Sequence, residues 1–515
     1  MSQKTIQPGI QRIHALAFEK YQSARREFVN TIAESARKPE NIDSLMQLQV
    51  LQLLRPLLLD TVSAIQQTAA LAIGRLANSR DNYAEQIVST GILPEVVNGL
   101  HSQDKHYIRN SSFVIRTIGR HSPELAQECV KAGALEPLVQ TFTEAPYNTP
   151  DVRESAANAL GTIASHNSDL AQSVIEAGTI PALISAVNSP ETSLCRVGVI
   201  ALGEIAKHSQ SFSQAIIDSN GIKCIAPYLT SSDPKLKQQV LITLSQIAKH
   251  SVDTAELVAD SPTFPSSISC LYDQDSGVRR AAASLICEVV KHTQELAQLV
   301  INNSGANALV QYLKNNNDPI NAVNAISSIA HFSSSLSTSL IESGAPYAVA
   351  CVFVSSKYAS VKAAAAKALG EMGQHSPTHA SALTQMNALS LLLEAHNDPS
   401  GSDELRKNTR HSLKIVIQKT SEIEALQCLI RRAPENILAY VLEQISKLLP
   451  KNPKARAPFV SSGGFKDVQN IKAEPGTKIA TYIEAINACY PDHAVRYYSP
   501  SYPQEIVDGL DKEAS

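Results

Sequence analysis

The chain has 515 residues, of which 43% are apolar and 18% charged, so it has ample material to bury and lacks the composition of a disordered protein. Its 45 Lys and Arg nearly balance its 48 Asp and Glu, so the charge of the whole molecule neither attracts nor rejects nucleic acid strongly. Any electrostatic function must therefore be local, and we expect no nucleic-acid partner. With no Trp, 10 Phe and 21 Gly, the composition favours a nearly all-α chain with small residues between helices.

The amino-terminal segment, residues 1–36, is predicted to form a helical cap. Its first residues, MSQKTIQPGIQR, lack the apolar core of a secretory signal. The longest apolar stretch of the chain, around Ala348 to Val354, is too short to cross a bilayer. We therefore expect a cytoplasmic location and no membrane partner.

Residues 37–470 contain a recurring phrase, which begins as RHSPELAQ at 120, SHNSDLAQ at 165, KHSQSFSQ at 207, KHSVDTAE at 249 and KHTQELAQ at 291. Its histidines are separated by 45, 42, 42 and 42 residues, and the longer first step coincides with TEAPYNTPDV, an apparent three-residue insertion. A period near 42 is typical of armadillo and HEAT units. It predicts an all-α, armadillo/HEAT-like right-handed superhelical solenoid of about nine or ten three-helix repeats, with a groove lined by the third helices.

The copy that follows His166 illustrates the three expected helices. Ser168 or Asn167 caps a short helix that ends near Gly178, a second runs from Pro181 to about Asn188, and the third spans about 191–207. The buried side of the third helix is predicted to carry Leu194, Val197, Ile200, Ala201 and Ile205.

The repeated histidine invites a metal or pH-switch hypothesis. Neighbouring repeats lie ~10 Å apart, however, whereas shared metal coordination needs about 2 Å. We therefore interpret these histidines as parts of the turn between repeats, next to the residue that caps the following helix.

Signs of catalysis are absent from the sequence. It contains no GxSxG, GxxxxGK[ST], HExxH or GxGxxG motif in the required context. The eight Cys are dispersed singly, which favours reduced thiols over a zinc or redox motif. We expect no enzyme activity, no cofactor, no metal and no small-molecule substrate.

Two sets of residues are candidate protein-binding sites. One is a basic edge on the third helices, formed by Arg116, Arg120, Lys207, Lys249 and Lys291, which could meet an acidic partner such as a microtubule surface. Solvated helix ends are the competing interpretation. The Trp and Asn ladder that reads basic peptides in nuclear-import adaptors is not present, since the chain has no Trp.

The second set lies in residues 471–515, predicted to form a helix and a Tyr/Pro-rich tail. Tyr497, Tyr498 and Tyr502 alternate there with prolines that prevent a further repeat. The tail is expected either to cap the last repeat or to anchor in a neighbouring subunit.

Several segments resemble the central-pair armadillo family of motile cilia, the sperm-associated antigen six family. They are FEKYQSARREFVNTIAE from Phe18, IQQTAALAIGRLAN from Ile65, SSGGFKDVQNIKAEPGT from Ser461 and INACYPDHAVRYYSPSY from Ile486. The last two are the most specific, because they are not generic armadillo sequence. The resemblance covers residues 15 to 510 and weakens around Ser261 to Ser267, Asn315 to Ser339 and Gly401 to Lys407.

This resemblance implies a structural scaffold of the axonemal central apparatus, on the C1 central microtubule, needed for central-pair stability and ciliary or flagellar motility. It implies tubulin and other central-apparatus proteins as partners, self-association, and a place in the cytoskeleton of the cilium. A soluble armadillo adaptor in cytoplasmic signalling or ciliary transport is the alternative.

Overall fold

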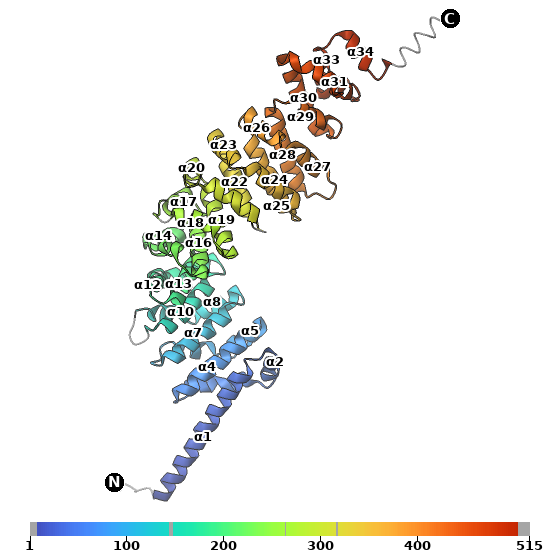
Figure 1. Ribbon diagram of the computed structural model, residues 1–515. Helices are drawn as coiled ribbons and strands as arrows, with labels where there is room; N and C mark the ends of the chain where they lie inside the picture. The colour runs from blue at the N-terminus through green and yellow to red at the C-terminus, as the bar shows by residue number, and fades with distance from the viewer. Residues whose placement is uncertain (1–7, 144–147, 263, 316–317, 503–515) are drawn as a thin grey trace, which may run out of the picture. The chain divides into compact units, whose positions relative to one another are not determined.

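The structure is a computed structural model that describes residues 8–143, 148–262, 264–315 and 318–502. These residues form helices and turns, without a strand among them (Figure 1). The fold is all-α and of the armadillo type, as predicted. The chain divides into two compact units, Met1–Phe264 and Pro265–Ser515.

Most helices fall into three classes that recur in order along the chain. The first helices are α2 (Pro39–Gln47), α5 (Asp81–Ser89), α8 (Pro123–Lys131), α11 (Ser168–Glu176), α14 (Gln210–Asp218), α17 (Val252–Ala259), α20 (Gln294–Asn302), α23 (Ser334–Glu342), α26 (Pro377–Thr384) and α31 (Arg456–Ser461). The second helices are α3 (Val50–Leu54) with η1 (Arg55–Leu59), α6 (Leu93–Gly99), α9 (Leu135–Gln140), α12 (Thr179–Val187), α15 (Gly221–Ile225) with η2 (Ala226–Thr230), α18 (Phe264–Ser269) with η3 (Cys270–Tyr272), α21 (Gly305–Asn315), α24 (Ala345–Ser355), α27 (Ala388–Asn397), α29 (Ile423–Ile430) and α32 (Gly464–Gln469). The third helices are α4 (Ser63–Ala77), α7 (Lys105–Gly119), α10 (Pro150–Ala164), α13 (Thr192–Ala206), α16 (Pro234–Ala248), α19 (Ser276–Val290), α22 (Ile320–Phe332), α25 (Ala359–Gly373), α28 (Asp403–Lys419), α30 (Glu435–Lys451) and α33 (Lys478–Asn487). Outside this scheme lie α1 (Pro8–Ser35), η4 (Pro453–Ala455) and α34 (Asp492–Tyr498).

The repeat formed by α11, α12 and α13 tests the predicted elements directly. Its three helices lie where the sequence places them, within two residues at each boundary. Asn167 is the cap, because its side chain accepts the Leu170 N–H at 2.8 Å. The prediction for the buried face of α13 was partly wrong: Leu194, Ala201 and Ile205 are buried, whereas Val197 and Ile200 are only half-buried, since the face turns toward the buried Cys195 and Val199.

A left-handed residue joins the first and second helices in most repeats. Gly178 has φ 83° there, and Asn220, one repeat later, has φ 62°. The next equivalent position is Pro262, which is not among the described residues with positive φ, because the pyrrolidine ring fixes φ near −65°. The turn of that repeat must therefore take a different path.

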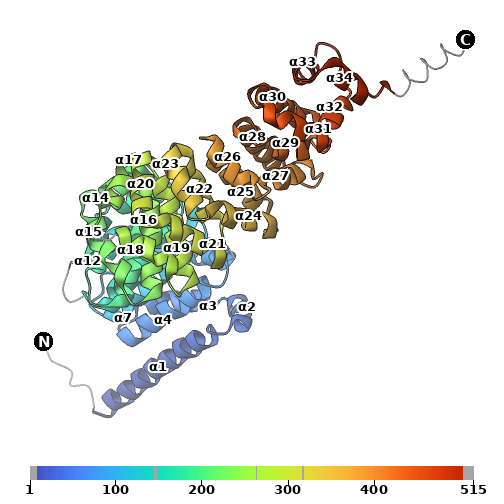
Figure 2. The same cartoon turned by 45° about the horizontal axis from the view of Figure 1, so that its top comes forward.

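Within each unit the third helices pack on one another in sequence (Figures 1 and 2). In the first unit α4, α7, α10, α13 and α16 contact in sequence, and in the second α19, α22, α25 and α28 do the same. Small residues allow the close approach: a Cβ on Gly161 would lie 2.9 Å from the Cβ of Ala201, and one on Gly370 would lie 2.7 Å from that of Ser412.

The helix α1 packs beside α4, in the place that a preceding third helix would take (Figure 2). Arg25 of α1 forms an ion pair with the buried carboxylate of Asp60. Farther toward its amino terminus α1 exposes Ile13, Phe18 and Tyr21, by 67%, 68% and 60%. The predicted cap segment is therefore a helix with one docked part and one part with exposed apolar side chains.

The array changes after α28. Three residues separate α28 from α29, which packs on α27 and α32 as a second helix does, so this repeat has no first helix among its described residues. Near residue 463 the standard pattern returns, since Gly463 has φ 88° between α31 and α32. The third helix α33 packs on α30, so the array extends to at least Asn487.

Candidate partner-binding surfaces

The repeated histidines form a ladder of bonds between successive repeats. The Nε2 atoms of His121, His208 and His250 lie 2.7 Å from the carbonyl oxygens of Ala77, Ala164 and Ala206, at the ends of the preceding third helices. His166 makes the same bond to Gly119 at 2.5 Å, and His375 to Ala330 at 2.7 Å. Last-turn carbonyls lack a partner within their own helix, so each histidine satisfies one of them. The sequence predicted that these histidines belong to the turns between repeats. The structure adds that each one also bonds to the preceding third helix.

No metal site accompanies the ladder in the described part of the chain, where no three His, Cys, Asp or Glu side chains are grouped as ligands. All eight Cys are free thiols. Cys129 is buried, and that burial raises its pKa to about 12, so this thiol is not a nucleophile at neutral pH. Over the same residues no single helix is long and apolar enough to cross a membrane, although two bent helix pairs, α11 with α12 and α23 with α24, match by length and composition.

The predicted basic edge lies at the ends of third helices, but most of its cationic side chains already bind other side chains of the array. Lys207 Nζ lies 2.6 Å from the Glu204 carboxylate, and Lys291 pairs with Glu288 in the same i, i+3 relation. Lys249 donates to the Gln246 side chain at 2.7 Å.

The two arginines of this edge belong to the end of α7. Arg120 donates to Asn78 Oδ1 at 2.7 Å, which ties two repeats together, whereas Arg116 is exposed. Four of the five predicted cations therefore have side-chain partners within the array, and as an anion-binding edge these residues remain a prediction.

The predicted tyrosines form an aromatic cluster on the last repeat. The rings of Tyr498 and Tyr490 lie 5.7 Å and 4.3 Å from the buried Phe465, and Tyr490 Oη donates to the Arg456 carbonyl at 3.2 Å. Tyr497 contacts Tyr498 and Tyr502 but is 60% exposed. Tyr490 and Tyr498 therefore pack on Phe465, whereas most of the Tyr497 side chain is exposed, and its role in binding a partner stays a prediction.

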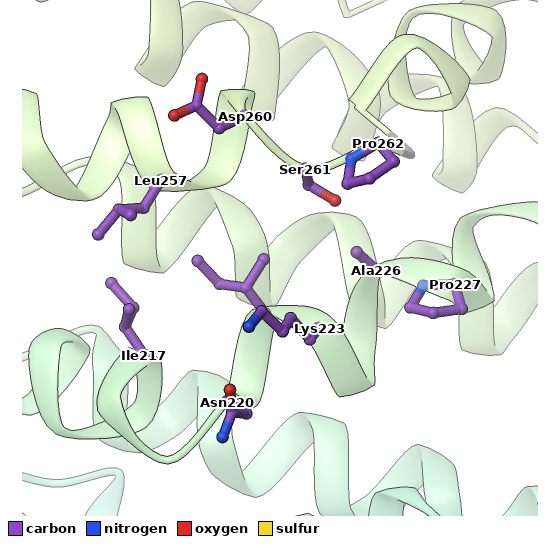
Figure 3. A pocket seen from close by; sticks show the side chains of 10 residues that line it. Ile217, Asn220, Lys223, Ala226, Pro227, Leu257, Asp260, Ser261 and Pro262 are labelled. Carbon is purple, nitrogen blue, oxygen red and sulfur yellow. The ribbon is translucent and has the colours of Figure 1, made fainter.

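An apolar hollow of about 510 Å³ was not anticipated from the sequence. Ile217 of α14 and Leu257 of α17 face each other across it, with Ala226 and Pro262 farther along its wall (Figure 3). Leu257 is 42% exposed. The hollow opens at the repeat where Pro262 replaces the left-handed turn residue. This replacement is visible in the sequence and could have indicated an irregular repeat there.

Comparisons with known proteins agree with this architecture. Over 151 residues, 29% of the chain, the sequence is 46% identical to sperm-associated antigen 6 of Mus musculus and 45% identical to that of Homo sapiens. The matched segment spans only 30% of the length of each relative. No protein-family model matches the chain.

Among solved structures, an engineered protein superimposes with a TM-score of 0.68 over 85% of this chain and 98% of its own, at 20% identity. A designed armadillo repeat protein covers 47% of this chain and 98% of its own, with a TM-score of 0.43 and 20% identity. The first of these likenesses supports the fold alone.

Proposed function

We propose that this chain, which belongs to the sperm-associated antigen 6 family of armadillo-repeat proteins, is a structural scaffold of the axonemal central apparatus in motile cilia. The observation that carries the proposal is the 46% identity to sperm-associated antigen 6 over 151 residues. An array of stacked third helices, which presents long surfaces and no described cluster of metal ligands, suits a protein that holds others together. We infer that it is not an enzyme and that it works by binding proteins.

The proposed partners are tubulin of the C1 central microtubule and other central-apparatus proteins. Binding along a microtubule would stabilise the central pair and so support motility. Exposed apolar side chains lie on α1, which packs beside α4, and at Tyr497, which lies next to Tyr498 and Phe465. A repeat array covers such apolar surface with a cap or with another subunit. Self-association through these side chains is therefore part of the proposal.

Imaging of the protein in a motile ciliated cell tests this function. The tagged chain is expected to remain after detergent extraction, to lie along the midline of the axoneme, and to be lost together with the central microtubules on depletion. A soluble or basal-body signal would contradict the structural role and favour a soluble adaptor in signalling or ciliary transport.

Sedimentation of the purified chain tests self-association separately. Wild type is expected to form oligomers, and the double variant Phe18→Ser/Tyr497→Ser to shift toward monomer with an unchanged circular dichroism melt. A wild type that is monomeric at every concentration would refute self-association and leave the ciliary role standing.

A further inference from the structure

The third helix α28 carries an unusual concentration of positive charge. Arg406, Lys407, Arg410 and Lys414 lie on it within nine residues, and with Tyr440 of α30 they line a hollow of about 430 Å³, which we call the basic groove. The labels α28 and α30 locate it in Figure 2. Most of its cationic side chains are exposed to solvent.

Arg406 is partly engaged, because it donates to the Pro399 carbonyl at 2.7 Å, whereas the other three cations form no ion pair with a described residue. None of the described residues that line the basic groove is acidic. Asp403, at the start of α28, lies 3.6 Å from Arg406 but is fully exposed, and Glu443 of α30 pairs with Lys447 instead. Within the described chain Lys407, Arg410 and Lys414 form no ion pair. The positive charge of the groove is thus compensated only at Arg406, and an anionic ligand is the natural complement of the other three cations.

A neighbouring histidine has a lowered pKa, chiefly because it is partly buried. His396 lies at the end of α27 and also lines the groove. Burial is the largest cause and lowers its pKa. A hydrogen bond with the Arg406 backbone acts in the opposite sense, and the positive charges of Arg410 and Arg406 add smaller contributions that lower the pKa further. His396 is therefore uncharged at neutral pH, and the positive potential of the groove comes from its arginines and lysines.

The spacing of the charges fits an extended chain. Arg406, Arg410 and Lys414 are four residues apart, so successive side chains leave α28 about 6 Å apart along its axis. Alternate side chains of an extended peptide are separated by about 6.6 Å. Acidic residues at every second position would therefore meet one cation each.

We propose that the basic groove binds an extended acidic peptide segment of a partner protein, with alternate Asp or Glu carboxylates against Arg406, Arg410 and Lys414. Arginine can hold a carboxylate through two parallel N–H donors, which suits this ligand better than a diffuse field alone. The proposal concerns the class of partner and does not depend on the location of the protein in the cilium.

A single-stranded nucleic acid is the main competing ligand. Such ligands need aromatic faces on which bases stack. Among the described residues Tyr440 is the one aromatic ring that lines the groove, apart from its histidines. Lys414 Nζ already lies over that ring, 5.6 Å from its centroid. This arrangement favours the peptide.

The test is a titration of the full chain against a fluorescein-labelled peptide of about eight glutamates, followed by anisotropy in about 100 mM NaCl. Wild type is expected to bind, and Arg410→Glu/Lys414→Glu to bind at least ~10-fold more weakly. The matched control Lys454→Glu/Lys472→Glu makes the same change in net charge at exposed positions outside the groove, and its affinity should stay within ~2-fold of wild type. Circular dichroism melts of both variants confirm that they fold.

Three outcomes would overturn the proposal. The first is equal loss in both variants, since binding would then follow net charge alone. The second is equal or tighter binding of a single-stranded oligonucleotide of similar length. The third concerns the acidic tail of this chain, which contains Glu505, Asp508, Asp511 and Glu513: if only a full chain with these four changed to amides binds the peptide, the occupant of the groove is the chain's own tail.

Discussion

The third helices α13 and α28 occupy the same place in their repeats but hold their charges in different ways. On α13, Lys207 pairs with Glu204 at 2.6 Å, and Arg196 pairs with Asp233 of the adjoining repeat at 2.7 Å. On α28, Lys407, Arg410 and Lys414 make no ion pair with a described residue. Cations that recur at a fixed position of a repeat are therefore part of its construction, whereas cations without counter-charges mark a surface available to a partner.

The largest expected effect is on stability. It concerns the close packing of α13 and of α28, each against the third helix that precedes it. Gly161→Val and Gly370→Val each place a branched side chain against a neighbouring third helix, where even a Cβ would lie within 3.0 Å of another atom. Each is expected to lower the free energy of unfolding by about 3 kcal/mol, because the helix backbones must separate. Chemical denaturation measures the loss. The control is Gly119→Ala, whose Cβ would find its nearest neighbour at 3.5 Å and which should be neutral or stabilising.

The comparison would fail if only one of these two valine variants were destabilised. Equal losses would establish that α13 and α28 differ in surface charge and not in packing.

The histidine ladder is a second difference between the two helices, because only α13 is followed by a ladder histidine. α13 is followed by His208, bonded to the Ala164 carbonyl, whereas α28 is followed by Thr420, whose hydroxyl bonds within its own helix to Val416. His208→Ala is expected to cost about 1 kcal/mol, since it leaves the carbonyl without this partner. Thermal denaturation against the exposed-histidine control His101→Ala, which should change nothing, measures it. An unchanged melting temperature in His208→Ala would refute the structural role of the ladder.

A smaller effect is expected from pH. Burial lowers the pKa of His208. The hydrogen bond to the Ala164 carbonyl and the charge of Glu204 oppose this shift, whereas the charges of Lys207 and Lys249 assist it. The unfolded chain therefore takes up a proton first, near pH 6.5. The stability due to neutral His208 is fully present above that pH and is lost as the pH falls through the folded pKa. The stability difference between wild type and His208→Ala should thus be larger at about pH 7.5 than at about pH 5.5; a difference that grows on acidification would contradict the assignment.

The smallest effect should follow from removing a counter-charge on α13. Glu204→Gln removes the carboxylate that pairs with Lys207. The variant would then have a single unpaired cation at this end of α13, whereas α28 has three, namely Lys407, Arg410 and Lys414. We expect at most ~2-fold tighter binding of the glutamate peptide and a stability change below about 0.5 kcal/mol. A gain that matched the affinity of the basic groove would show that spacing on α28 is unimportant.

The sequence predicted the repeat well, because its signals are local. The cap Asn167 and the turn residue Gly178 act on adjacent backbone, and the 42-residue period is visible by inspection. The candidate site was harder to predict, because it depends on contacts across repeats. The sequence alone does not show that Lys207 is paired with Glu204. Nor does it show that a hollow forms beside Leu257, where Pro262 replaces the left-handed turn residue.

The basic groove was missed for a related reason. Its cations follow a spacing within one helix and not the period of the repeat, so aligning the repeats did not reveal them. A helical projection of α28 would have placed Arg406, Arg410 and Lys414 on one face.

The ladder bonds also show that the stacking of repeats accommodates a longer connection. His121 and Ala77 are 44 residues apart, whereas His166 and Gly119 are 47 apart, yet the bond between repeats is the same. The three added residues lie between α9 and α10 and leave the stacking intact. The connection between α9 and α10 is accordingly a suitable place to insert an epitope or a fluorescent reporter with which to follow the protein in living cells.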